Sequence, residues 1–417
     1  MAQLSNDCFA FGDKPLSIEE ALAFIRERVA AVTDVEELPL AACDGRVLAV
    51  DLRALSPLPA FFNAAVDGYA VSHAELSDSA ETRLPVVGRL QAGAASIPAL
   101  AARTTMRIFT GAPVPAGADT VFMQEDVRLE GAIAVLPAGL KRGANARPAG
   151  EEIMAGAVAI TGGTRLLPQH LALAAGIGHG RLMVRKPVRV AIFSTGDELV
   201  EPGSALSAAK VHDTNRIMLN ALLQRIGCTV SDLGILRDDL ETLRTALKRA
   251  AVDHDLILTS GGVSTGEADY IKSAVEAEGR LDHWRFAIKP GRPLAMGVIG
   301  GCAFAGLPGN PVAVFVTFTQ IVRAVLAALG GETWQPPRFT PVRAGFRSAK
   351  KTGRIEFLRV SLVDGPDGPV AMRYPIEGAG IISSLTATDG MLRLPLDLTS
   401  VDEGDKVDYL PFSAMLG

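Results

Sequence analysis

The sequence has few of the residues that build disulfide frameworks or zinc knuckles. Its 417 residues include four cysteines, and none of them forms a Cys-x-x-Cys pair: Cys8, Cys43, Cys228 and Cys302. Such spacing predicts reduced thiols in a cytoplasmic protein, without a structural zinc site.

Long uninterrupted apolar runs are also missing. The most membrane-like stretch, residues 311–329, opens on Pro311 and is interrupted by Gln320 and Arg323. We therefore expect a buried helix there and no membrane span. The first residues show no basic-then-apolar signal segment, so we expect a soluble protein without a membrane partner.

An excess of positive charge is absent as well. The net charge is −5, which argues against a general nucleic-acid binder but leaves room for a local cationic pocket. Hydrophobic residues make up 48% and charged residues 21%, an ordinary globular balance. A chain of this length predicts about two to four domains. It contains no clear internal repeat and no low-complexity segment.

The N-terminal third alternates between helical and β-prone patterns. Residues 15–32 predict a helix, with Ser17 as N-cap and Glu20 completing a capping box. From Ser56 to about Leu140, short β-prone runs alternate with Gly/Pro turns, and they cover residues 84–90, 106–109, 120–123 and 132–136. Residues 168–176 then predict a helix, so the β segment is interpreted as an insertion.

A strand–helix rhythm begins at Pro187. Predicted strands at residues 188–193, 229–236 and 256–258 alternate with two helices. The first helix is capped by Asp213 or Thr214, and the second by Asp238 in a capping box with Glu241. This rhythm predicts a doubly wound parallel sheet with ligands at the carboxyl ends of its strands. Beyond residue 336 the pattern turns β again, with expected strands at 354–360 and 406–410.

The chain is organised around residues 255–272. Gly261 and Gly262 allow a sharp turn after the central strand, and Ser264 or Thr265 can cap a helix that begins near Ala268. A helix N-terminus favours an anion by about 0.3–1 kcal/mol. Asp269 is expected one turn inside the N-terminal end of this helix, so we expect its carboxylate to bind a ligand hydroxyl, an amine or a bridging metal ion. The alternative is a plain strand-to-helix connection.

Other polar and glycine-rich segments are expected at the same edge of the sheet. Thr195, Gly196, Asp197 and Glu198 follow one strand, Ser260 another, and Asp238 a third. Residues 289–293 are expected to form a cationic loop that contains Lys289 and Arg292. A second helix N-terminus is expected at Pro308, Gly309, Asn310 and Pro311, with Asn310 as N-cap. These groups suit a phosphorylated ligand and a divalent metal. The alternative is a weak surface ion-pair network.

Several motifs resemble one family. Residues 260–270, Ser-Gly-Gly-Val-Ser-Thr-Gly-Glu-Ala-Asp-Tyr, resemble the signature of molybdenum-cofactor biosynthesis proteins. Residues 61–71 and 110–121 resemble two motifs of the molybdopterin molybdenumtransferase family, whose bacterial members are called MoeA and which includes the E domain of gephyrin. Residues 143–152 resemble a third motif, although Glu152 stands where the family has Asp. Residues 381–385 resemble a fourth, with Ala379 and Asp389 replacing Ser and Asn.

The resemblance implies a multidomain α/β fold. The expected parts are an N-terminal extended α/β domain (13–55 and 142–186), an inserted small β domain (56–141), a molybdopterin-binding α/β domain (187–332) and a C-terminal β-barrel-like domain (336–414).

The resemblance also implies an activity. The family inserts molybdenum from molybdate into adenylated molybdopterin and releases AMP with molybdenum cofactor. It implies catalytic roles for Asp67, Thr110, Glu198 and Asp269, of which Glu198 and Asp269 would hold Mg²⁺, with Zn²⁺ as an alternative. Substrate-binding roles are implied for Ser384 and for the strand-end, turn and loop residues at the carboxyl edge of the sheet: Thr195, Gly196, Asp197, Asp238, Ser260, Gly261, Gly262, Ser264, Lys289, Arg292, Pro308, Gly309, Asn310 and Pro311. A homodimer with a shared cleft is expected, as is a molybdopterin-adenylylating partner protein.

Two other functions remain open at this point. One is adenylyl transfer to molybdopterin, although relatives with that activity typically consist of the α/β domain alone. The other is a non-catalytic scaffold, and the departures at Glu152, Ala379 and Asp389 leave room for a degraded paralogue.

Overall fold

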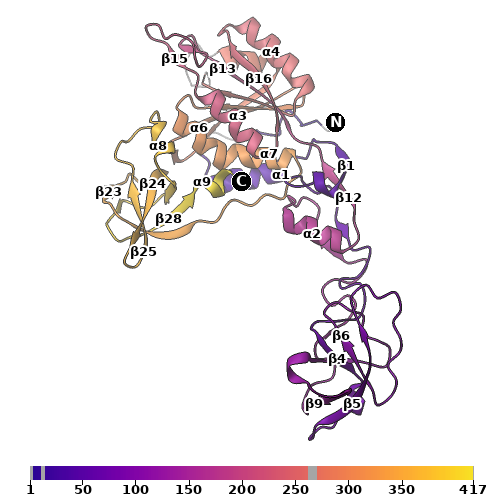
Figure 1. The fold of residues 1–417 in the computed structure, drawn as a ribbon. Helices are drawn as coiled ribbons and strands as arrows, with labels where there is room; N and C mark the ends of the chain where they lie inside the picture. Colours follow the sequence, from indigo (N-terminus) through magenta and orange to yellow (C-terminus); the bar gives the residue numbers. More distant parts are fainter. Residues whose placement is uncertain (1–2, 11–14, 262–269, 417) are drawn as a thin grey trace.

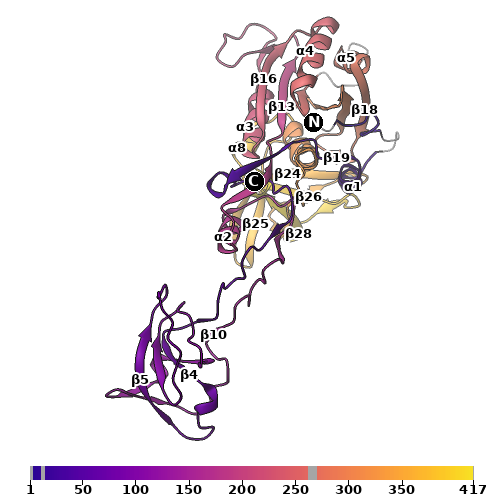
Figure 2. The same ribbon diagram turned by 90° about the vertical axis from the view of Figure 1, so that its right-hand side faces the viewer.

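The computed structural model describes residues 3–10, 15–261 and 270–416. Figures 1 and 2 show three parts: a body that holds most of the chain, an arm that leaves it, and a lobe at the far end of the arm. We call residues 187–261 and 270–416 with α1 (Ile18–Arg28) the body, residues 35–55 and 158–186 the arm, and residues 56–157 the lobe. The domain limits expected from the sequence stay a prediction.

The body is built on a six-stranded sheet. Its strands lie in the order β16 (Thr229–Leu236), β13 (Arg189–Thr195), β17 (Leu256–Ser260), β21 (Cys302–Leu307), β20 (Pro293–Ile299) and β18 (Gly279–Arg285). The first four run parallel, whereas β20 and β18 run antiparallel to their neighbours. The periodicity did not predict this reversal. It arises because Gly300 and Gly301, both at positive φ, join β20 to β21 in a tight hairpin.

Helices cover both faces of this sheet, which confirms the doubly wound architecture. Val190 and Ile192 of β13 face one hydrophobic core, and Ala191 and Phe193 face the other. The first face carries α1 (Ile18–Arg28), α3 (Asn215–Arg225), α6 (Pro311–Thr317), the π-helical turn η4 (Phe318–Val322) and α7 (Arg323–Leu329). The second carries α4 (Leu240–Asp253) and α5 (Tyr270–Glu278).

One helix, Pro311–Leu329, is long and apolar enough to cross a membrane by length and composition, within the described residues. It is 89% buried inside the body, as a core helix would be. The expectation of a buried helix at residues 311–329 is confirmed.

The helix starts show where local patterns succeeded. Ser17 and Glu20 form the predicted capping box of α1, but the helix ends at Arg28 rather than near residue 32, because Val32 donates its N–H to Leu329 of α7. Thr214 occupies the N-cap position of α3 without a side-chain bond, while the Asp213 carboxylate accepts the N–H of Arg216 at 3.2 Å.

The cap predicted for α4 was wrong by one residue. Asp239, not Asp238, is the N-cap, and its carboxylate accepts the N–H of Thr242 at 2.9 Å. Asp238 instead accepts a hydrogen bond from Thr195, at the end of the neighbouring strand.

The C-terminal part of the body is a closed five-stranded barrel. Strand β24 pairs with both β25 and β26, which closes the ring of β24 (Ile355–Gly365), β25 (Gly368–Arg373), β22 (Thr340–Ala344), β28 (Lys406–Pro411) and β26 (Gly390–Leu394). Short elements complete it: β23 (Ser348–Ala349), α8 (Ser383–Thr386), β27 (Ser400–Val401) and α9 (Phe412–Leu416). Strand β19 (Ile288–Lys289) pairs with β24, so the predicted cationic loop begins against the barrel.

The arm consists of two antiparallel strand pairs and one helix. Its elements are β1 (Val35–Pro39), η1 (Leu40–Ala42), β2 (Leu52–Arg53), β11 (Val158–Ile160), α2 (Pro168–Gly176) and β12 (Arg181–Arg185), with β1 paired to β12 and β2 to β11. Helix α2 has the predicted bounds, with Pro168 in its first turn. The Leu58 N–H bonds to the carbonyl of Ile153 at 2.8 Å, where the chain enters and leaves the lobe side by side.

The lobe is a small β structure. Its sheet has the order β7 (Thr120–Met123), β4 (Gly68–Val71), β6 (Thr105–Ile108), β5 (Thr82–Leu90), β9 (Ile133–Leu136) and β8 (Arg128–Glu130). The pair β3 (Asn63–Ala64) and β10 (Ala146–Arg147), with the turns η2 (His73–Glu75) and η3 (Gln124–Asp126), completes it. The four expected β-prone runs correspond to β5, β6, β7 and β9, whose bounds differ from the expected ones by two residues at most, whereas β3, β4, β8 and β10 were not expected.

Candidate functional site

A pocket of about 650 Å³ lies where the carboxyl edge of the body sheet meets the barrel. It gathers seven of the residues predicted from the sequence: Glu198, Gly261, Lys289, Arg292, Pro308, Gly309 and Asn310. The barrel side contributes Arg354 and Ala379. The segments come together because strands β13, β17 and β21 run parallel and end at one edge.

The floor of the pocket depends on two glycines. Gly261 has φ +86° and donates its N–H to the Leu307 carbonyl at 3.0 Å. A β-carbon on Gly309 would lie 3.8 Å from the Gly261 Cα, so the two loops approach closely. Ser260, buried at the end of β17, precedes this turn. The predicted residues Gly262, Ser264 and Asp269 lie outside the described residues.

The N-terminus of helix α6 differs in detail from the prediction. Helix α6 begins at Pro311 and Asn310 is its N-cap, but the Asn310 side chain makes no capping hydrogen bond. The N–H of Val312 instead bonds to the carbonyl of Ala379 at 3.0 Å. The barrel thus satisfies one of the free N–H groups at this helix end.

A group of carboxylates lies after strands β13 and β16. Gly196 has φ +145°, and a β-carbon there would lie 2.7 Å from Oε2 of Glu198. The missing side chain lets the Glu198 carboxylate fold back over the turn. The Thr195 hydroxyl donates to Asp238 at 3.3 Å. Lys210, from the segment between β14 (Leu199–Val200) and β15 (Val211–His212), donates to the Asp197 carbonyl.

Burial and negative neighbours together raise the pKa of Asp238. Burial is the largest cause, and the charges of Asp197, Glu198 and Asp239 add to it, while the bond from Thr195 opposes them. These carboxylates therefore share one neighbourhood, and a divalent cation would relieve their repulsion. Within residues 3–10, 15–261 and 270–416, no group of three or more His, Cys, Asp or Glu side chains is arranged to hold a metal ion.

The cationic side of the pocket is tied to the barrel. Glu356, 6% exposed, accepts from Lys289 Nζ at 3.4 Å and from Arg354 Nε at 3.0 Å. Arg292 is exposed and makes no ion pair with any described residue. Lys289 therefore pairs with Glu356 rather than with Asp197 or Glu198. Asp269, the third carboxylate of the alternative ion-pair network, lies outside the described residues. Sequence reasoning missed Glu356, whose only signal was its place beside Arg354.

A smaller hollow of about 80 Å³ adjoins the pocket through Lys289 and Ala379. Arg359, 8% exposed, lines it together with Arg373. Arg359 donates to the Ser384 hydroxyl at 3.0 Å and to the Gly378 carbonyl at 3.1 Å, and it makes no ion pair with a described residue. Burial, followed by the charge of Arg373, lowers the pKa of Arg359. A buried cation held by neutral acceptors favours an anionic ligand.

Ser384 supports this arginine. Its side chain is fully buried, and its hydroxyl donates to the Ile381 carbonyl at 2.5 Å while it accepts from Arg359. The predicted substrate-binding residue Ser384 does not line either hollow. Its contacts assign it to orienting Arg359.

Asp67 and Thr110 meet in the lobe. The Thr110 N–H and hydroxyl donate to the Asp67 carboxylate at 2.8 and 2.7 Å. These bonds, the backbone one first, lower the pKa of Asp67. The guanidinium of Arg107 stacks at 5.0 Å over each of the Tyr69 and Phe109 rings beside them. The carboxylate is therefore held ionised and oriented.

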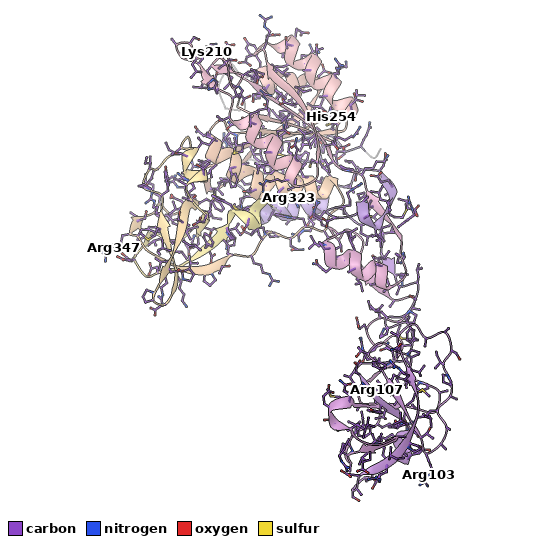
Figure 3. All side chains as sticks on the ribbon, viewed as in Figure 1. Arg103, Arg107, Lys210, His254, Arg323 and Arg347 are labelled. Atoms are coloured by element: carbon purple, nitrogen blue, oxygen red, sulfur yellow. The ribbon has the colours of Figure 1, made fainter. Side chains whose placement is uncertain are left out.

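Within one chain, the lobe lies far in space from the part of the body that holds the pocket. Figure 3 labels Arg107 in the lobe and Lys210, which bonds Asp197, at the far end of the body. A single chain therefore does not bring Asp67 to Glu198. At the base of the lobe, Arg147 forms ion pairs with Glu151 and with Glu152, so the longer side chain of Glu152 still reaches this arginine.

Comparisons with known proteins cover nearly the whole chain. Three family models match: the MoeA N-terminal region (domain I and II) over residues 16–178, a probable molybdopterin binding domain over residues 191–328, and the MoeA C-terminal region (domain IV) over residues 341–412.

Individual relatives agree with these matches. The molybdopterin molybdenumtransferase of Haemophilus influenzae is 36% identical over 409 residues, which cover 96% of this chain and all of that protein. The molybdopterin molybdenumtransferase 2 of Mycobacterium tuberculosis is 32% identical over 94% of this chain and 98% of its own length. The crystal structure of a molybdopterin biosynthesis moeA protein from Pyrococcus horikoshii OT3 superposes with a TM-score of 0.80, at 28% identity, covering 95% of this chain and 99% of that one.

Proposed function

The chain belongs to the molybdopterin molybdenumtransferase family, and from that premise we propose where this member binds its substrates and how its residues act. It is a transferase of molybdenum cofactor biosynthesis that inserts molybdenum from molybdate into adenylated molybdopterin, with AMP as the second product. Adenylyl transfer and a scaffold role, the alternatives open from the sequence, are not proposed.

The adenylate binds in the pocket at the carboxyl edge of the body sheet. The observation that carries this proposal is the convergence of seven predicted residues on one pocket of about 650 Å³, a size that suits a nucleotide-like ligand. The close turns at Gly261 and Gly309 admit phosphate oxygens near the backbone, and the exposed Arg292 meets their charge. Thr195, Gly196 and Asp197 shape the neighbouring turn.

Molybdate is a small dianion, and it suits the smaller hollow beside this pocket. Lys289 borders both hollows, so it can contact the adenylate and the oxyanion together. Arg359 adds a buried positive charge that forms no ion pair with a described residue. The two carboxylates that line the hollow pair with other cations: Glu377 with Arg373, and Glu356 with Lys289 and Arg354. In this proposal the incoming metal oxyanion binds next to the molybdopterin end of the adenylate.

Glu198 and Asp269 hold Mg²⁺ in this proposal, with Zn²⁺ as the alternative ion and the other carboxylates nearby. The supporting observation is that Asp197, Glu198 and Asp239 add to the rise in the pKa of Asp238 that burial mainly causes, because like charges gathered at one edge favour a bound cation. The ion would polarise the phosphoanhydride of adenylated molybdopterin and help AMP leave. The residues of the chain orient the substrates around it.

The protein acts as a homodimer, in which the lobe of one subunit completes the pocket of the other. Support comes from the separation within one chain between the lobe, which holds Asp67 and Thr110, and the body (Figure 1), which holds the residues that line the pocket. We place the reaction in the cytoplasm, with a molybdopterin-adenylylating protein supplying the substrate.

Subunit mixing tests this arrangement. Asp67→Asn and Glu198→Gln should each abolish most single-turnover AMP release and cofactor formation from adenylated molybdopterin, Mg²⁺ and molybdate. A refolded equimolar mixture should recover about a quarter of wild-type activity, since half the dimers are mixed and each keeps one intact cleft. The matched control mixes Asp67→Asn with Thr110→Val, both in the lobe, and should recover nothing. Equal behaviour of the two mixtures would rule out a shared cleft.

A further inference from the structure

The arm and the body have separate hydrophobic cores. Cys43, Leu48, Leu166 and Val184 belong to the cluster inside the arm, whereas the helices of the body pack in two other clusters. A hollow of about 510 Å³ lies where the two parts meet, and its lining includes five arginines as well as apolar residues such as Val47, Val188 and Leu326. Continuous apolar packing therefore does not brace the arm at this place, and polar contacts set its direction.

The main polar contact is an ion triad centred on Glu332. This carboxylate, whose side chain is 7% exposed, accepts from Arg165 of the arm at 3.0 and 2.6 Å and from Arg323 of α7 at 3.1 Å. Burial by itself would raise the pKa of Glu332, but the bonds and charges of both arginines bring it below its usual value. Figure 3 labels Arg323 in the middle of the body, where it also stacks on Trp334 at 5.8 Å. Glu332 is thus held between one guanidinium from each part.

Further bonds make the triad directional. Arg165 Nη1 donates to the Gly45 carbonyl at 2.5 Å, inside the arm, and reaches the Ile226 carbonyl of the body at 3.4 Å. The Thr333 N–H bonds to the Gly163 carbonyl at 2.9 Å. Gly163 has φ +82°, and a β-carbon there would lie 2.4 Å from the Thr333 hydroxyl. We call residues 163–165 and 331–333, with Arg323, the joint.

We propose that Arg165 and Glu332 are positioning residues for the transfer reaction: by holding the joint they fix the direction of the arm, and so place Asp67 and Thr110 of the lobe in the pocket of the partner subunit. This rests on the shared cleft proposed above. Because the lobe lies at the far end of the arm (Figures 1 and 2), a rotation at the joint moves Asp67 much further than it moves Arg165. Misplacing a catalytic group by about 1 Å can cost about 100-fold in rate.

The first test compares two arginines of the arm. Arg165→Met breaks the joint, whereas Arg181→Met removes an exposed arginine that pairs with Glu37 inside the arm. We expect Arg165→Met to lower kcat at least tenfold, while the equilibrium Kd for adenylated molybdopterin changes less than twofold, because that pocket lies in the body. Arg181→Met should leave both quantities unchanged. Arg165→Lys, which keeps the charge, should recover part of kcat.

The second test measures the arm directly. Spin labels at Ser79→Cys in the lobe and Val252→Cys on α4, both exposed positions, report the distance between lobe and body. Labelled protein is diluted into excess unlabelled protein, so that each dimer carries at most one labelled chain. Arg165→Met and Glu332→Gln should broaden the distance distribution, and Arg181→Met should not.

The outcomes separate this inference from the proposed function. An unchanged distance distribution with unchanged kcat in Arg165→Met would overturn the positioning role. A parallel loss of kcat, adenylate affinity and melting temperature would also overturn it, since it would show a merely structural role. Failure of the subunit-mixing experiment would refute the shared cleft, but the distance measurement would still decide whether the joint sets the arm.

Discussion

Gly196 shows how a single missing side chain shapes the candidate site. Its place in the turn after β13 lets the Glu198 carboxylate fold back to where a β-carbon would stand. The motif in the sequence identified both residues, because glycine after a buried strand marks a turn. The direction of the Glu198 side chain could not be read from the sequence, since it depends on the φ of +145° that the surrounding loop imposes.

At this scale we predict that Gly196→Ala lowers transferase turnover by about tenfold or more, because the methyl group displaces the Glu198 carboxylate. Gly203→Ala is the matched control: Gly203 also has positive φ, at +90°, but nothing lies within 4 Å of the place that its new methyl group would take. Both variants put a β-carbon at a positive φ, so both carry a backbone cost. Turnover and melting temperature, measured together, separate displacement from strain. Equal turnover in the two variants would contradict the role given to Glu198.

The burial of Arg359 could not be predicted from its neighbours in the sequence. In the sequence it is one of two arginines in the β-prone run 354–360, with no local feature that predicts burial of its charge. In the structure it is buried beside Ser384, a residue 25 positions away. Burial of a charge is decided by whatever packs around it, which local sequence does not specify.

At the scale of elements, β16 and α2 have the bounds expected from periodicity, because strong apolar patterns with clear stop signals encode them. Helix α4 was displaced by one residue at its start. Two consecutive aspartates, Asp238 and Asp239, precede Leu240, and both offer an acceptable cap. In the structure Asp239 caps the helix, because the Asp238 carboxylate accepts a hydrogen bond from Thr195 on the neighbouring strand instead.

This choice gives a test. Asp239→Ala should destabilise α4 by about 1 kcal/mol, since it removes the acceptor for the Thr242 N–H. Asp238→Ala should leave the protection of α4 unchanged, because its carboxylate bonds Thr195 instead. Hydrogen exchange resolved to the first turn of α4 measures both. Greater exchange in Asp238→Ala than in Asp239→Ala would restore the cap predicted from the sequence.

At the scale of the whole molecule, the joint makes the attachment of the arm depend on pH. The pKa of Glu332 in the folded protein lies below its ordinary value of 4.5. A group with a depressed folded pKa contributes stability that is complete above its unfolded pKa and is lost as pH falls through the folded one. The acid limb of stability should therefore include a contribution from Glu332.

We predict that wild-type protein loses thermal stability more steeply than Glu332→Gln as the pH falls below about 4.5, although Glu332→Gln is the less stable protein at neutral pH. Melting temperatures across this range, recorded in one buffer series, measure the difference. Parallel acid limbs in the two proteins would show that Glu332 does not titrate with unfolding.

The sequence by itself determined the family, the doubly wound body and most of the residues at the strand ends. Those features follow from periodicity, capping and short motifs, which act over a few residues, and from the rule that parallel strands end at one edge. Only the tertiary structure decided that Lys289 pairs with Glu356, 67 residues away, and that Arg165 meets Glu332 across 167 residues. It also decided how far the lobe that holds Asp67 lies from the rest of the chain (Figure 1). Contacts this distant along the chain depend on how whole elements pack and where their charges are buried, which no local pattern encodes.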